Sequence, residues 1–247
     1  MAAGMAKQGL TPVVAIYSSF LQRGYDQLIH DTALSDLHVV FAVDRAGMVG
    51  ADGETHHGIF DATFLSDIPN MTVLCPSSFA ELRAMLHRAI YEIKGPVAIR
   101  YPRGGEGEYR SDSGAANIVS LREGEDITLC AYGTMINNVL DAADILEGEG
   151  ISARVIKINA ISPLYDSDMR SAVGKTKALL VAEECASVGC MGQRMAAILA
   201  WYKMSPERLE LCNLGKTFPA QGSVEALYRE FGLDVASLAK KAAEVLR

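Results

Sequence analysis

The sequence predicts an α/β protein with two domains, each built on a mostly parallel sheet. Three observations lead to this prediction. Apolar segments of strand length alternate with helical patterns, 49% of the residues are hydrophobic, and the alternation stops near 104–124 before it restarts. The interrupting segment is rich in glycine and charge, which is typical of a linker. We therefore predict a first domain over 1–103, a linker over 104–124 and a second domain over 125–247.

The N-terminal residues 1–10 are expected to form the end of an alanine-rich helix. Four apolar segments then have the length and composition of buried strands, at 12–17, 38–43, 71–75 and 97–101. The clearest helical pattern lies between the last two, over 77–91, with its apolar residues near one face. Ser77 and Ser78 follow Pro76, and Glu81 comes three residues after Ser78, so a helix start with a capping box is predicted there.

The second domain repeats the alternation. The linker itself has a weak strand pattern at 117–121. Beyond it, strands are expected at 126–131, 153–158, 177–182 and 209–213, and helices at 134–147, 189–203, 222–231 and 233–246.

Composition argues against several classes of partner. The net charge is −7 and basic residues do not gather with aromatic ones, so we expect no nucleic-acid partner. No apolar run reaches the roughly 20 residues that a membrane helix needs, and the N-terminus does not resemble a signal peptide, so we expect a cytoplasmic protein without a membrane partner. The five scattered cysteines fit reduced, buried thiols. Cys185 and Cys190 lack the further ligands of a zinc site, so no metal ligand is predicted.

The richest polar segment is 44–61, directly after the strand predicted at 38–43. Ligands usually bind at the carboxyl ends of the strands in α/β proteins, and the four glycines of this segment allow close approach of the backbone. Arg45 has the forked geometry that suits a phosphate, and His56 can exchange a proton near neutral pH. Asp52 and His56 are four residues apart, which fits either a solvated turn or a proton-handling pair.

Other candidates also follow strands. Tyr17, Phe20 and Arg23 come after the first strand, where residue types alone indicate packed aromatics and a solvated arginine. Arg45 and Arg103 each follow a strand end, and they are either surface charges or two halves of a phosphate clamp. Arg100 should point away from Tyr101 and is therefore less favoured than Arg103.

Four further polar residues have less distinctive settings. Asp61 is expected to cap the short helix after it, and His57 fits a spectator role. Glu183 and Glu184 follow the strand at 177–182, but a carboxylate pair at a strand end is only a weak signal for acid–base chemistry.

Three segments together resemble the 1-deoxy-D-xylulose-5-phosphate synthase family, thiamine-diphosphate enzymes related to transketolase. They are Pro12–Gln27, the polar segment 44–61 and Ala98–Gly104, and the resemblance continues weakly over 125–247. It implies a pyrimidine-binding domain followed by a transketolase C-terminal domain. The implied reaction decarboxylates pyruvate on thiamine diphosphate and transfers two carbons to D-glyceraldehyde 3-phosphate.

The resemblance also implies roles for particular residues. Phe20 would stack on the aminopyrimidine ring of the cofactor, with Arg23 facing the same site. Tyr17, Arg45 and Arg103 would bind the substrate phosphate. Asp52 and His56 would surround the cofactor-bound pyruvate adduct, and the Glu183–Glu184 region would contribute to subunit contacts away from the chemistry.

Two parts of the family's active site do not occur in this sequence. The Gly-Asp-Gly motif for diphosphate and Mg²⁺ is absent, and residues 1–20 contain no acidic residue to protonate the cofactor ring. We therefore expect a C-terminal portion that lacks the N-terminal domain with its Mg²⁺ ligands and the start of the pyrimidine-binding domain. Such a chain should be inactive alone, whether it is a fragment, a subunit of a split enzyme or a remnant. A homodimer is expected, with the face around Phe20 and His56 open until an N-terminal domain or a partner subunit covers it.

Three alternatives remain at this point. The chain could be the C-terminal section of a transketolase, the beta-type subunit of a 2-oxo-acid dehydrogenase, or a non-catalytic interaction module. The polar segment 44–61 and the Arg-Tyr-Pro-Arg-Gly segment favour the synthase.

Overall fold

The first sheet has the strand order β1-β2-β4-β3-β8. The computed structural model describes residues 1–112, 114–173 and 176–247. Within them, this sheet consists of β1 (Val13–Tyr17), β2 (Val40–Asp44), β3 (Thr72–Leu74), β4 (Val97–Arg100) and β8 (Ala160–Ser162). The strands β1, β2, β4 and β3 are parallel, and β8 runs antiparallel to β3. All of β4 is buried, as expected for a strand in a sheet covered on both faces.

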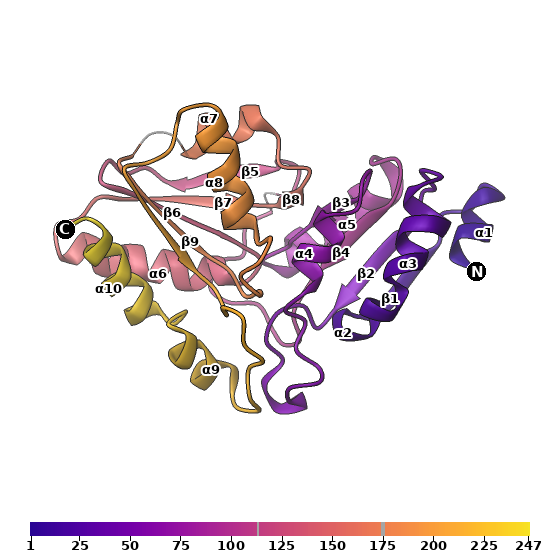
Figure 1. Cartoon of the computed structure of the whole chain (residues 1–247), viewed down its shortest axis with the longest axis horizontal. Coiled ribbons are helices and arrows are strands. Elements are labelled where there is room, and N and C mark those ends of the chain that lie inside the picture. The colour runs from indigo at the N-terminus through magenta and orange to yellow at the C-terminus, as the bar shows by residue number, and fades with distance from the viewer. Residues whose placement is uncertain (113, 174–175) are drawn as a thin grey trace.

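The second sheet has the order β10-β9-β6-β7-β5. Its strands are β5 (Ile118–Arg122), β6 (Ile127–Tyr132), β7 (Ala153–Ile158), β9 (Ala178–Ala182) and β10 (Arg208–Cys212). They are parallel except for the edge strand β5, which is antiparallel to β7. The two sheets lie in separate lobes (Figure 1), which confirms the predicted fold of two mostly parallel α/β units.

Helices cover both sheets. The first lobe has α1 (Ala2–Lys7), α2 (Ser18–Leu21), α3 (Tyr25–Gln27), α4 (Asp61–Ser66) and α5 (Phe79–Tyr91), with the short turns η1 (Gln22–Gly24), η2 (Leu28–Ala33) and η3 (Gly50–Asp52). The second lobe has α6 (Met135–Gly148), α7 (Asp166–Val173), α8 (Met191–Trp201), α9 (Val224–Phe231) and α10 (Val235–Val245). The start of α5 agrees with the predicted capping, because the Ser78 hydroxyl accepts from the Glu81 amide at 3.1 Å.

One apolar cluster joins the two lobes. It contains Leu65 and Val73 of the first lobe, and Ile156, Met191 and Leu199 of the second. It therefore fills both the α2–α4 side of the first sheet and the α7–α8 side of the second. Separate clusters pack α5 on the first sheet and α6 with α10 on the second. The shared cluster fixes the carboxyl ends of the first sheet against the second lobe.

Two features differ from the prediction. The strand β5 lies inside the predicted linker, at the weak strand pattern of 117–121, and belongs to the second sheet. Conversely, β8 comes from the predicted second domain and extends the first sheet through β3. The pattern of β8 was missed because three residues are too few to show a period.

The cysteines and acidic side chains of the described part of the chain do not form a metal site. All five cysteines are buried and free, and no group of three His, Cys, Asp or Glu side chains is placed to bind a metal ion. No described helix combines the length and the apolar character that a bilayer crossing requires.

Candidate active site

Aromatic side chains pack against one another at the carboxyl end of β1. The chain leaves the strand at Tyr17 and enters α2 at once, which brings Phe20 back beside Tyr17. Their rings are stacked, with centroids 5.3 Å apart and planes 6° from parallel. The His56 ring meets Phe20 edge-on at 5.5 Å. Phe20 remains 46% exposed, so an apolar ring face is left available at the end of the sheet.

Two arginines reach the same place from neighbouring strands. Arg45 follows β2 with a left-handed backbone (φ 57°), and its guanidinium carbon lies 3.8 Å from the centre of the Tyr17 ring. Its Nε is 3.7 Å from Oδ2 of Asp52, and its Nη1 pairs with Asp44. Arg103, beyond the end of β4, donates from Nη1 to Oδ1 of the same Asp52 carboxylate. One carboxylate is thus shared by two guanidinium groups.

The six residues Tyr17, Phe20, Arg45, Asp52, His56 and Arg103 therefore form one connected cluster at the carboxyl edge of the first sheet, which we call the arginine–aromatic cluster. Two converging guanidinium groups can bind a phosphate or carboxylate with charge-assisted hydrogen bonds. Asp52 now takes that position, so an incoming anion would have to displace it.

Asp52 pairs with the arginines rather than with His56. The Nδ1 atom of His56 instead lies 2.9 Å from the Thr55 hydroxyl, and its ring edge meets Phe20. The arrangement in which Asp52 orients the imidazole is therefore not the one the structure shows. Arg23 is exposed on η1, and its side chain makes no hydrogen bond or ion pair with the described residues.

Arg100 has a structural role. Its side chain is buried, and Nε and Nη2 donate to the two oxygens of Asp61 at 3.0 and 3.1 Å. Burial lowers the pKa of Arg100, but the charge and hydrogen bonds of Asp61, together with Tyr132 and Cys75, outweigh it, so the pKa of Arg100 is raised. Asp61 also accepts from the Ala62 amide at 2.9 Å, so its cap-like contact is secondary to the ion pair.

The loop that carries Asp52 and His56 is anchored on the second lobe. Nδ1 of His57 accepts from the Val49 amide at 3.1 Å, and its Nε2 lies 3.2 Å from the Ala220 carbonyl oxygen. An acceptor role for Nδ1 leaves the proton on Nε2, which donates to Ala220. The side-chain amide of Gln221 donates to the Ala51 carbonyl at 3.0 Å. His57 is therefore a structural link between this loop and the second lobe.

Glu184 also anchors this loop to the second lobe. Its Oε2 accepts from the Met48 amide at 3.0 Å, and its Oε1 accepts from the Tyr228 hydroxyl at 2.7 Å. Burial raises the pKa of Glu184, and the hydrogen bonds from Tyr228 and Met48 oppose that shift. Gly47 has a positive φ of 80°, and a Cβ there would lie 2.6 Å from Oε2 of Glu184, so glycine is required at this contact.

Glu183 has a different structural role. Its carboxylate accepts from the amides of Met191 and Gly192 at 3.1 and 2.9 Å, at the start of α8. This contact satisfies free N–H groups of a helix N-terminus. The two neighbouring glutamates are therefore a helix cap and a loop anchor rather than an acid–base pair.

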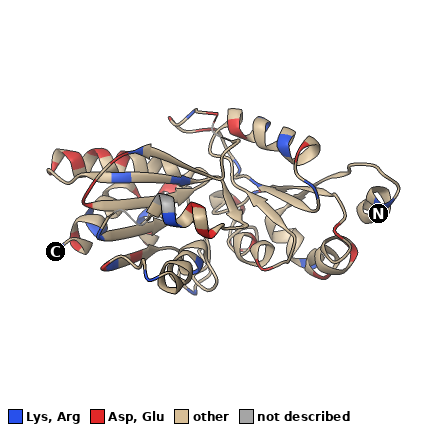
Figure 2. Ribbon diagram, turned by 90° about the horizontal axis from the view of Figure 1, so that it is seen from above, with Lys and Arg blue, Asp and Glu red and all other residues tan. Residues whose placement is uncertain are grey.

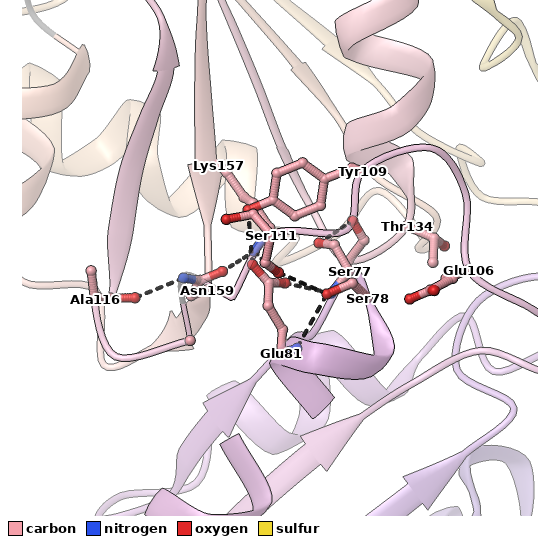
Figure 3. Close-up of polar contacts among 12 residues, drawn as sticks. Ser77, Ser78, Glu81, Glu106, Tyr109, Ser111, Ala116, Thr134, Lys157 and Asn159 are labelled. Carbon is pink, nitrogen blue, oxygen red and sulfur yellow. Dashed lines mark hydrogen bonds and ion pairs between the residues drawn. The ribbon is translucent and has the colours of Figure 1, made fainter. Parts of the chain in front are cut away.

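A buried polar network fixes α5 of the first lobe to β7 of the second (Figure 3). Glu81 and Lys157 are fully buried, and Lys157 Nζ lies 2.9 Å from Oε2 of Glu81. The same carboxylate accepts from the Ser77 amide at 2.8 Å and from the Tyr109 hydroxyl at 2.9 Å. Asn159 accepts from Lys157 and donates to the Ala116 carbonyl at 2.8 Å. The segment after Arg103 is held in this way between the lobes.

Two family models match the chain, one after the other along the sequence. The family model described as "Transketolase, pyrimidine binding domain" matches residues 1–106, and the model described as "Transketolase, C-terminal domain" matches residues 114–238. The chain belongs to the transketolase family. The strands of the first sheet lie within the first match and those of the second sheet within the second match. The exception is β8, which lies within the second match but belongs to the first sheet.

Relatives of this transketolase-family chain are named 1-deoxy-D-xylulose-5-phosphate synthase. The protein from Chlorobium luteolum is 45% identical over 100% of the chain and 40% of its own length. Those from Chlorobaculum tepidum and Dechloromonas aromatica are 43% and 46% identical, over 39% and 37% of their own lengths. The chain thus corresponds to a portion of these longer relatives, about two fifths of the Chlorobium luteolum protein.

Solved structures agree with the fold. A structure titled "Split gene transketolase, inactive beta4 tetramer" is similar with a TM-score of 0.86 and 28% identity, over 99% of this chain and 79% of that one. A transketolase mutant from Pichia stipitis has a TM-score of 0.77 at 20% identity, over 95% of this chain and 34% of that one. The second likeness concerns the fold alone.

Proposed function

We propose that this chain forms the C-terminal part of a 1-deoxy-D-xylulose-5-phosphate synthase. The reaction would decarboxylate pyruvate and transfer the two-carbon unit to D-glyceraldehyde 3-phosphate, giving a precursor for isoprenoid and thiamine synthesis. The observation that carries the proposal is the shared name of the relatives, which match the whole chain. The convergence of Arg45 and Arg103 on Asp52, at the carboxyl edge of the first sheet, supports a phosphorylated acceptor.

In this proposal the arginine–aromatic cluster binds the phosphate of the acceptor. Arg45 is ordered by its contact with the Tyr17 ring, and Arg103 is half exposed and can approach a ligand from the solvent side. When the phosphate arrives, Asp52 gives up its arginine partners and its carboxylate turns to the bound substrate. His56 would hold or move a proton at Nε2, since its Nδ1 is occupied by Thr55.

Thiamine diphosphate fits the aromatic part of the cluster. The exposed face of Phe20 is flat and apolar, which suits a heteroaromatic ring, and Arg23 lies one turn further along. When bound, thiamine diphosphate supplies the carbanion chemistry that amino-acid side chains lack. This chain's residues would hold the pyrimidine ring, while the diphosphate and Mg²⁺ would be bound by the part of the enzyme that corresponds to the rest of the relatives' length.

The partners follow from the same proposal. An N-terminal domain or partner subunit would cover the open face around Phe20, and the assembly would be a homodimer in the cytoplasm. A completed enzyme can be made by joining or mixing this chain with the remaining part of a relative, such as the Chlorobium luteolum protein. We call this assembly the completed enzyme.

A second candidate is the C-terminal section of a transketolase. It is favoured by the likeness to the split-gene transketolase structure, which covers nearly the whole chain. The two reactions differ in their donors: the synthase uses pyruvate, whereas transketolase uses a ketose phosphate. Both would bind a phosphorylated acceptor with the same two arginines, so the cluster by itself does not separate them.

The donor specificity of the completed enzyme tests the proposal. With D-glyceraldehyde 3-phosphate as the acceptor, we expect turnover with pyruvate to exceed turnover with D-fructose 6-phosphate by at least about 100-fold, a difference of about 2.7 kcal/mol in activation free energy. Product formation is measured by chromatography under identical conditions. A preference for the ketose donor would assign the chain to transketolase instead.

A further inference from the structure

A polar cavity lies between the lobes, away from the arginine–aromatic cluster. Its volume is about 470 Å³, and its walls come from α5 of the first lobe and from β5, β7 and α7 of the second. The polar side chains that line it are those of Arg88, Asn117, Ser120, Arg154 and Asp168. No residue of the arginine–aromatic cluster is among its lining residues.

Arg154 is the unusual member of this cavity. It is the second residue of β7, and its side chain is only 4% exposed. Its Nε and Nη1 atoms are buried and make no hydrogen bond with any residue in the described part of the chain. An ion pair with Glu123 is long, at 3.7 Å, and the Glu123 carboxylate is 73% exposed. Exposed carboxylates are strongly hydrated and pair weakly.

The contrast with Arg100 shows what Arg154 lacks. Arg100 is also buried on a strand, but Asp61 meets its guanidinium with two hydrogen bonds. A buried donor left without an acceptor disfavours the folded state. Arg154 is one of the residues that line an open cavity, so a ligand there could supply acceptors to its guanidinium once the buried nitrogens turn toward the cavity.

We propose that this cavity binds a small anion, with its phosphate or carboxylate group held by the guanidinium of Arg154. Guanidinium groups bind both kinds of anion through two parallel hydrogen bonds. Arg88, whose Nη1 donates to the Gly114 carbonyl, adds a second positive charge. Asp168 lines the same cavity, which disfavours a polyphosphate and favours a singly anionic group with a neutral polar remainder.

The ligand would connect the two lobes. Arg88 belongs to α5 in the first lobe, and Arg154 belongs to β7 in the second. The cavity is lined by residues of α5, β5, β7 and α7, whereas the arginine–aromatic cluster lies at the carboxyl ends of the first sheet. This inference does not depend on the proposed function.

The test is a titration of the full 247-residue chain with inorganic phosphate, and separately with pyruvate as a carboxylate probe. It is carried out in an Arg103→Ala background to weaken binding at the arginine–aromatic cluster, with ionic strength held constant by chloride. We expect saturable binding by calorimetry, with backbone amide shifts at Asn117 and Ser120. Arg154→Met should weaken binding at least tenfold. The probe that binds more tightly identifies the anionic group.

A matched control is Arg122→Met, on the neighbouring strand β5. Arg122 already pairs with Asp144 at 2.7 Å and with Glu147, so its loss should leave anion binding unchanged. Circular dichroism checks that each variant is folded. If Arg154→Met does not fold, Arg154→Lys keeps the charge but loses the fork and should weaken binding severalfold. The inference is wrong if neither probe binds saturably, or if the folded Arg154 variant binds as tightly as the control.

Discussion

Replacing Arg103 with Ala in the completed enzyme should lower kcat/KM for D-glyceraldehyde 3-phosphate by about 30-fold or more. Truncating one member of a hydrogen-bonded charge pair typically costs about 2–5 kcal/mol, and the half-exposed position of Arg103 places the effect near the lower limit. The loss should appear mainly in KM for the acceptor, because the arginine binds a phosphate that does not react. Initial rates at varied acceptor concentration give both constants.

The specificity of this effect can be checked in two ways. D-glyceraldehyde lacks the phosphate, so its slower reaction should be nearly unaffected by Arg103→Ala. Arg110→Ala is the matched control, because Arg110 lies on the same connecting segment and is exposed, with a weak ion pair to Glu106 at 3.7 Å and a long hydrogen bond to the Gly107 carbonyl at 3.4 Å. An equal loss with both acceptors would show that Arg103 does not act on the phosphate.

Replacing Lys157 with Met should destabilise the chain by about 3–5 kcal/mol. The change removes the cationic partner of the fully buried Glu81 carboxylate. A buried charge without a partner strongly destabilises the folded state. Burial lowers the pKa of Lys157, while Glu81 opposes that shift, so the pair is held together against a large desolvation cost. Urea unfolding followed by circular dichroism measures the loss.

The double variant Glu81→Gln with Lys157→Met separates the charge from the packing. Removing both charges should recover a substantial part of the stability, whereas the effects of two unrelated sites would add. Lys240→Met serves as the control, since Lys240 is exposed and its ion pair with Glu244 spans 3.9 Å; it should change stability by under about 0.5 kcal/mol. A small effect of Lys157→Met would mean that the network does not hold the lobes together.

Regular elements with a clear period could be predicted from the sequence. The strands β1, β2, β6 and β7 and the helices α5, α6 and α10 lie within one or two residues of their expected positions. Their apolar patterns are local and several residues long, so the pattern alone identifies them. The short strand β8 joins the sheet of the other lobe, which depends on tertiary packing that a local pattern does not contain.

The candidate site could also be predicted only in part. Residues at strand ends, such as Tyr17, Arg45 and Arg103, could be identified because the carboxyl ends of parallel strands meet at one edge. The partners of these residues could not be identified. The spacing of Asp52 and His56 fitted either a solvated turn or a proton-handling pair, whereas Asp52 lies between the two arginines. Contacts between residues far apart in sequence, such as Glu184 with Met48, leave no spacing signal in the chain.

The central claim is that this chain supplies the acceptor-binding half of a synthase site. The most direct measurement is the formation of 1-deoxy-D-xylulose 5-phosphate from pyruvate and D-glyceraldehyde 3-phosphate, with thiamine diphosphate and Mg²⁺ present. The purified chain alone should give no product, because its sequence has no Gly-Asp-Gly motif and residues 1–20 include no carboxylate. The completed enzyme should turn over. Product from the chain alone, or none from a folded completed enzyme, would contradict the claim.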